Sequence, residues 1–182
     1  MNRKTVAILF AVLCLAQWIV PGKMIWDKEK IMENGREYQF LVRPVDPNDP
    51  MRGKYVVLSF DPRTFIVDGP GMKVGDLVYI TLYEDSDGIS YPSELKTERP
   101  DAYVDFFEAK ISGVNGAEVE IACPFDRFYM EESKAPQAET IFRQSFSDLS
   151  QQTVAIVHIL EGEAVLKDVQ IGGVSLTQLA GE

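Results

Sequence analysis

The sequence is poor in cysteine and in positive charge, and each shortage excludes a class of protein. Only two cysteines occur in 182 residues, and Cys14 lies inside an apolar run, so neither a disulfide framework nor a cysteine-rich zinc site fits. Lys and Arg total 18 against 28 Asp and Glu, which gives a net charge of −10. Because nucleic-acid binding requires clustered positive charge, we expect no nucleic-acid partner.

Recognisable catalytic motifs are missing as well. The chain contains no P-loop, no G-x-G-x-x-G and no H-E-x-x-H sequence. The single histidine, His158, lies in the apolar run V-A-I-V-H-I-L, where a structural histidine is favoured over a general base. Signal peptidases place a nucleophilic serine shortly after their anchor, but no serine occurs between Met1 and Leu58. The sequence therefore favours a protein that is not an enzyme, and it indicates no metal and no cofactor.

An apolar run at residues 5–20 is the longest hydrophobic segment of the chain. It is shorter than the roughly 20 residues that span about 30 Å of hydrocarbon. Continuing to Trp26 reaches that length, with Trp18 and Trp26 placed as interfacial aromatic residues. We therefore predict a membrane anchor at residues 1–26, in which Pro21 ends the regular helix.

The orientation of this anchor follows from Arg3 and Lys4, because positive charge is retained on the cytoplasmic side of a membrane. The rest of the chain then lies outside the cytoplasm. This predicts a single-pass protein of the inner or cytoplasmic membrane with a periplasmic domain. A cleavable signal peptide is the alternative, since it also combines a basic start with a short apolar segment, and Cys14-Leu15-Ala16 resembles a small-x-small cleavage site.

The remainder of the chain has the pattern of a short helix followed by a β-rich domain. Residues 27–36 end in Asn34-Gly35 and are predicted to be a juxtamembrane helix or linker. Apolar and polar residues then alternate in segments separated by glycine-containing turns, as in strands with one buried face. The predicted strands are residues 37–43, 54–60, 64–67, 74–82, 105–112, 117–124, 153–160 and 164–171, and a helical stripe occupies 133–150.

These elements predict the fold class of residues 37–182. So many amphipathic strands in one domain are buried most simply by a partly closed barrel or a two-layer β assembly. We therefore predict a mainly β fold with one or two short helices behind an N-terminal membrane helix.

Two acidic turns are candidate cation sites. In the hairpin tip at residues 84–88, Asp85 and Asp87 have part of a calcium-loop spacing, but Tyr83 holds the first ligand position, so an ordinary acidic hairpin is favoured. The D-P-N-D-P segment at residues 46–50 offers two carboxylates and an amide. Asx-Pro steps form turns for structural reasons, which is the favoured interpretation there.

Residues 43–60, R-P-V-D-P-N-D-P-M-R-G-K-Y-V-V-L-S-F, resemble the signature of the GDYXXLXY family, which is named for the motif Gly-Asp-Tyr-x-x-Leu-x-Tyr. The positions that match the motif in register are Gly53, Tyr55 and Leu58. Lys54 replaces the aspartate of the motif, and Phe60 replaces its final tyrosine. The segments D-R-F-Y-M-E-E near Asp126 and A-V-L-K-D-V-Q-I-G-G near the end are also similar to the family.

The resemblance implies a membrane-tethered extracytoplasmic domain, and members of the family are often encoded beside multi-spanning membrane proteins. We therefore predict a binding or accessory domain whose partner is an integral membrane protein. The candidate binding residues are Asp46, Asp49, Arg52, Tyr55, Arg127 and Tyr129. Bracing of the fold is the competing role for Arg52 and Tyr55, and we expect the motif to be mainly architectural. The functional alternative is a cell-envelope hydrolase that uses acidic residues near Asp46 and Asp49.

Overall fold

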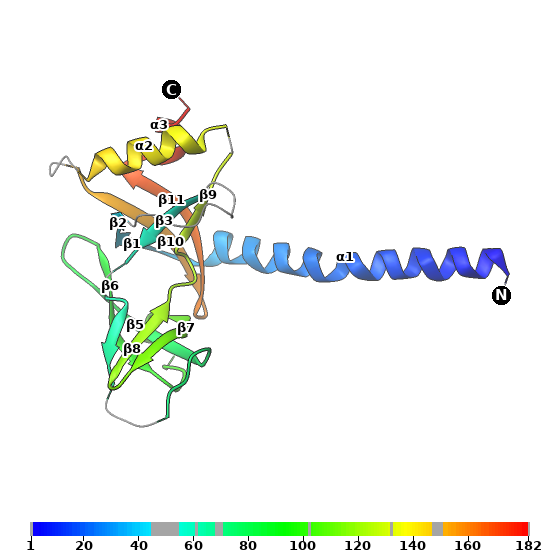
Figure 1. Cartoon of the computed structure of the whole chain (residues 1–182), viewed down its shortest axis with the longest axis horizontal. Helices are drawn as coiled ribbons and strands as arrows, with labels where there is room; N and C mark the ends of the chain where they lie inside the picture. Colours follow the sequence, from blue (N-terminus) through cyan, green and yellow to red (C-terminus); the bar gives the residue numbers. More distant parts are fainter. Residues whose placement is uncertain are drawn as a thin grey trace.

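The computed structural model consists of a β-rich body from which one long helix projects (Figure 1). It describes residues 2–44, 55–60, 62–67, 71–101, 103–131, 133–146 and 151–181. The helices are α1 (Arg3–Asn34), α2 (Ala135–Ser145) and α3 (Leu176–Leu179). Strands dominate the body, so the predicted mainly β fold with two short helices behind an N-terminal helix is confirmed.

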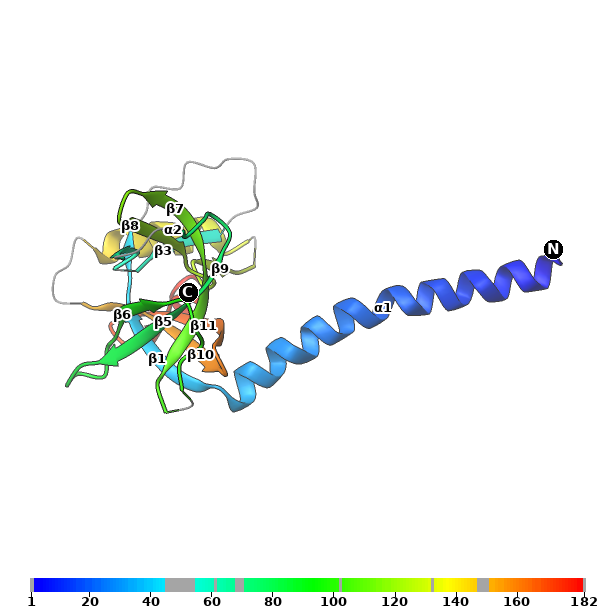
Figure 2. The ribbon, with the colours of Figure 1, turned by 90° about the horizontal axis from the view of Figure 1, so that it is seen from below.

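Helix α1 is a single element of 32 residues. The prediction that Pro21 ends the helix is wrong, because α1 continues through Pro21 to Asn34 (Figure 2). Proline removes one helical hydrogen bond, but Lys23 pairs with Asp27 at 2.6 Å one turn later, and several of the residues after Trp26 are good helix formers. Among the residues that the structure describes, no helix is both long enough and apolar enough to cross a membrane.

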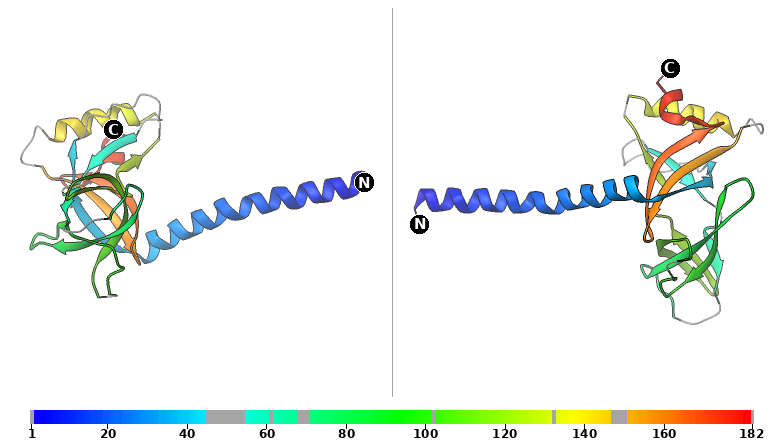
Figure 3. Two further views of the ribbon diagram at one scale, coloured as in Figure 1. Left: turned by 60° about the horizontal axis from the view of Figure 1, so that its bottom comes forward. Right: turned by 180° about the vertical axis from the view of Figure 1, so that it is seen from behind.

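The largest sheet has five antiparallel strands in the order β4-β8-β7-β5-β6 and curls into a nearly closed barrel (Figure 3). Its strands are β4 (Thr64–Ile66), β5 (Leu77–Glu84), β6 (Ser90–Lys96), β7 (Phe106–Asn115) and β8 (Glu118–Ala122). Alternation sets the inner face, because Val119 and Ile121 of β8 are buried while the flanking Glu118 and Glu120 are exposed. The sheet is therefore apolar inside and acidic outside along β8.

Two smaller sheets complete the body. The four-stranded sheet has the order β1-β10-β11-β12, and the three-stranded sheet has the order β2-β3-β9. Their strands are β1 (Arg36–Leu41), β10 (Thr153–Leu160), β11 (Glu163–Ile171), β12 (Val174–Ser175), β2 (Arg43–Pro44), β3 (Tyr55–Ser59) and β9 (Arg127–Tyr129). Figure 1 shows α2 and α3 at one end of the body and the five-stranded sheet at the other, with β10 and β11 between them.

Four phenylalanines join the three sheets in one core. Phe40 of β1 lies against Phe60, Phe107 and Phe125, with ring centroids 5.8, 6.4 and 5.1 Å away. The four rings are at most 2% exposed. Aromatic pairs at these distances contribute packing beyond their buried area. Phe60, which replaces the tyrosine of the family motif, therefore serves as a core residue here.

The joint between α1 and the body gives a first prediction. A Cβ added at Gly35 would lie 2.4 Å from the Ile31 carbonyl oxygen and 3.2 Å from the His158 Cβ, whereas one added at Gly22 would meet nothing within 4 Å. We expect Gly35→Ala to lower the free energy of unfolding by about 1–3 kcal/mol, because the backbone at the joint must shift. Gly22→Ala is the matched control and should leave it unchanged or raise it by up to about 1 kcal/mol. Equal denaturation midpoints for the two variants would contradict this account of the joint.

Candidate functional site

The predicted site residues divide between one short ladder and a segment outside the described residues. Asp46, Asp49 and Arg52 lie in the undescribed range 45–54. The other three lie on β3 and β9, which pair antiparallel with Tyr55 opposite Tyr129 and Val57 opposite Arg127. The structure therefore brings the signature segment and the D-R-F-Y segment together, although they are far apart in the sequence.

The ladder is anchored in the core on the side of the signature strand. Leu58, a matching motif position, is fully buried, and its N–H donates to the Asp126 carbonyl at 2.9 Å. On β9, the Tyr129 side chain is 68% exposed, and Arg127 Nε lies 3.6 Å from the Asp126 carboxylate. The buried positions of the motif hold β3 against β9, which supports the architectural interpretation.

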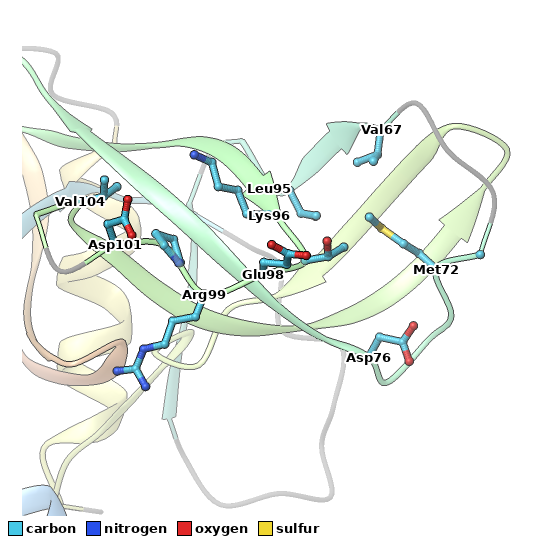
Figure 4. Close-up of a pocket in the computed structure, with 12 residues that line it drawn as sticks. Val67, Met72, Asp76, Leu95, Lys96, Glu98, Arg99, Asp101 and Val104 are labelled. Carbon is cyan, nitrogen blue, oxygen red and sulfur yellow. The ribbon is translucent and has the colours of Figure 1, made fainter.

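A pocket lies elsewhere, at the open seam of the five-stranded sheet (Figure 4). Its volume is about 820 Å³, and its walls include Val67, which follows the end strand β4, and Leu95, which belongs to the other end strand, β6. The charged residues that line the pocket are Asp76, Lys96, Glu98, Arg99 and Asp101. Apolar and charged side chains of both signs thus share one concave surface.

Arg99 links this pocket to the rest of the body. Its side chain turns away from the pocket centre in Figure 4, and Nη2 donates to the Glu161 carbonyl oxygen at 2.9 Å. Its guanidinium carbon lies 5.7 Å from the centroid of the Phe106 ring. Glu161 belongs to the turn between β10 and β11, so Arg99 ties the seam of the barrel to the four-stranded sheet.

A second pocket, of about 600 Å³, shares Arg99 and Val104 with the first. Arg36 lines this pocket and forms ion pairs with Asp105 at 2.7 Å and with Glu84 at 3.2 Å. Burial, and then the hydrogen bond to Asp105, raise the pKa of Tyr38 above its ordinary value, so this phenol keeps its proton in alkaline solution where an exposed tyrosine would ionise. The Arg36 guanidinium also lies over the Tyr38 ring, 5.1 Å from its centroid.

Asp85 and His158 each contact partners that stabilise the fold. Asp85 Oδ1 accepts the backbone N–H groups of Asp87 and Ile89 at 2.9 Å each, which makes the acidic tip an ordinary hairpin turn. His158 is buried, and its Nε2 lies 3.3 Å from both Glu37 and Lys167. Within the described ranges, no group of three or more His, Cys, Asp or Glu side chains could hold a metal ion.

The two pockets could not be identified from the sequence. The 820 Å³ pocket depends on residues 71–76 and 97–101, which meet because β4 and β6 are the two ends of one curled sheet. The 600 Å³ pocket depends on the approach of residues 99–100 and 104–106 to β1 and to the turn between β10 and β11. The one local signal in these loops is a mixture of charges around a proline, E-R-P-D at residues 98–101, and such mixtures are common in turns. Neither pocket contains Arg127 or Tyr129.

Cys123 gives a second prediction. Burial raises the pKa of its thiol to about 12, against roughly 8.5 for an unfolded cysteine. Between these values the folded thiol stays protonated while the unfolded thiol ionises, so the folded state binds more protons and loses stability as the pH rises. We expect denaturation above pH ~9 to show a loss on the order of 1 kcal/mol per pH unit. Cys123→Ala should remove this part of the slope, and an unchanged slope in that variant would contradict the assignment.

The fold defines a class of protein: a β-rich domain with a nearly closed, five-stranded barrel-like sheet, joined to a long N-terminal helix. A family model described as "GDYXXLXY protein" matches residues 17–169, and the chain belongs to the GDYXXLXY family. The match includes the second half of α1, the signature strand β3 and most of the β10–β11 hairpin. No curated protein and no solved structure shows a significant match to the chain.

Proposed function

We propose that this protein is an accessory domain that α1 holds at a membrane, on the extracytoplasmic side, where the body binds an integral membrane protein. The single observation that carries the proposal is the surface of α1. Large apolar side chains on all sides of its N-terminal part are more than half exposed: Leu9, Phe10, Val12, Leu13, Leu15, Trp18, Ile19 and Val20. A helix that is apolar all round is stable where lipid or other protein covers it.

The sequence of α1 indicates that lipid, rather than protein, surrounds its apolar surface. Residues 5–20 carry no charge, with Arg3 and Lys4 before them and Lys23 after them. An apolar segment somewhat shorter than the bilayer is accommodated by local thinning and by flanking basic and aromatic side chains that reach the interface. Trp18 and Trp26 are 76% and 73% exposed and are placed for that role. The basic start orients the body away from the cytoplasm.

The attachment of α1 to the body supports a positioning role. Ile31 is only 3% exposed, and Lys28 Nζ lies 3.6 Å from Glu163 on β11. Because α1 is continuous from Arg3 to Asn34, this contact fixes the direction of the body relative to the helix. A tether without a loose linker holds a binding surface at a set height and orientation. The occurrence of family members beside multi-spanning membrane proteins supports an integral membrane protein as the partner.

The experiment that tests the tether is fractionation of cells that produce the full chain. After an alkaline wash, the chain should remain in the membrane pellet, and mass spectrometry should find residues 1–26 still attached. Protease added to the extracytoplasmic side should digest the body. Release by the wash would show that protein, rather than lipid, covers α1, and a mature N-terminus after Ala16 would establish the signal-peptide alternative.

A further inference from the structure

An apolar groove of about 350 Å³ lies beside the base of α1. Its floor is built from small side chains of three strands and the loop after β8, namely Ala109, Ala122, Cys123, Pro124 and Ala164. Small residues leave room for the side chains of an occupant and let a second backbone approach closely. Leu77, at the start of β5, lines the groove and is 47% exposed. This groove therefore offers an apolar surface that no described residue fills.

The position of the groove restricts its occupant. Lys28 of α1 forms part of the wall, and it follows Trp26 by two residues, which corresponds to about 3 Å along a helix. If Trp26 marks the membrane interface, as in the proposed function on which this inference rests, the groove opens just above the bilayer. A segment that leaves the membrane alongside α1 would reach it at once.

The charges at the rim decide between a lipid and a protein. Lys28 and Lys110 line the groove together with Glu108 and Glu163, so the two signs are balanced. An anionic lipid headgroup would meet two carboxylates here, and Lys28 is already paired with Glu163 at 3.6 Å. An apolar centre with a balanced polar rim is the usual composition of a protein interface. The buried Cys123 thiol, whose pKa is raised by burial, stays neutral and adds no charge to the floor.

We infer that this groove binds the apolar extracytoplasmic end of a membrane helix of the integral partner, which runs beside α1. The occupant places large apolar side chains over Ala109, Ala122 and Ala164, and its flanking polar residues meet the balanced rim. The groove thereby continues, above the bilayer, the helix-to-helix contact that α1 makes within it.

Site-specific photo-crosslinking in intact membranes tests this contact. A photoreactive amino acid at Leu77 should crosslink to one integral membrane protein, and the same probe at Ile66 is the control, since Ile66 is also apolar and strand-borne, is 81% exposed and does not line the groove. Comparable yields at both positions, adducts with lipid alone, or no adduct at Leu77 would overturn the inference.

A substitution provides a second, independent readout. Leu77→Asp should reduce recovery of the partner in mild detergent by about tenfold, while Ile66→Asp should leave it unchanged. An equal effect of the two substitutions would overturn the inference. Alkaline washing of the same membranes separates this failure from failure of the proposed function. If both variants stay in the pellet, attachment through α1 is supported whatever the groove binds. If both are released, membrane attachment through α1 and partner binding in the groove are refuted together.

Discussion

Phe107→Ala is expected to lower the free energy of unfolding by about 3–5 kcal/mol, the usual cost of emptying a phenylalanine site in a packed core. Phe107 lies on β7 of the five-stranded sheet, is fully buried and packs its ring 6.4 Å from Phe40 and 5.2 Å from Phe125. Its removal therefore weakens the contact between the barrel and the four-stranded sheet as well as the barrel itself. Chemical denaturation of the full chain in mild detergent, monitored by far-ultraviolet circular dichroism, measures the change.

The control for this substitution is Tyr103→Ala. Tyr103 is also a large aromatic residue, but its side chain is 99% exposed, so its loss should change the free energy of unfolding by less than about 0.5 kcal/mol. Similar costs for the two variants would mean that the aromatic cluster is not the centre of the fold.

Replacing Leu9 and Leu13 with arginine is expected to remove most of the protein from the membrane fraction. Both side chains lie within the uncharged segment of α1 and are 55% and 57% exposed. An arginine near the centre of an inserted helix costs about 2.5–3.5 kcal/mol on insertion scales, so two of them should outweigh the gain from a segment of only sixteen residues. Immunoblots of alkaline-washed membranes and of the soluble fraction measure the distribution.

Leu9→Met combined with Leu13→Met is the matched control, because it changes the same positions while preserving apolarity and volume. This variant should remain in the pellet to the same extent as the unchanged chain. If the arginine variant also remained there, the apolar surface of α1 would not be what holds the protein, and contacts of the body with a membrane protein would have to be sufficient.

The strands with long alternating patterns could be predicted from the sequence because one face of each is buried. The prediction for residues 153–160 coincides with β10, and that for 117–124 contains β8. β9 could not be predicted, since its three residues form a strand only by pairing with β3. The sequence predicts a helix that ends near Pro21 and a further helix or linker at residues 27–36, but it does not indicate that both segments belong to the single helix α1, because proline and the following Gly22 usually interrupt a helix.

The candidate site was predictable only where a family motif marked it. The similarity of two segments to one family identified Tyr55, Arg127 and Tyr129, and the structure places them on one ladder. The pockets around Arg99 and the groove beside Lys28 have no such signal, because they are formed by residues from separate strands. The charges and sizes of these pockets depend on how the sheets close, and no local sequence pattern predicts that closure.

The two departures from the motif lie in different parts of the chain. Phe60 lies in the core, 5.8 Å from Phe40 and 5.0 Å from Phe125, where a phenylalanine ring needs no hydrogen-bond partner. Lys54 lies outside the described residues, together with Asp46, Asp49 and Arg52. The binding role of Asp46, Asp49 and Arg52, and the hydrolase alternative that uses the two carboxylates, therefore stay predictions. Leu58 and Phe60 account for the architectural part of the motif.

The most direct test of the central claim is recovery of the affinity-tagged full chain from native membranes in mild detergent, with quantitative mass spectrometry of what accompanies it. We predict one dominant integral membrane protein in near-stoichiometric amount, which is lost when Leu77 is replaced by aspartate and retained when Ile66 is. Recovery of the chain alone under conditions that preserve other membrane complexes would contradict the claim that this domain works by binding a membrane partner.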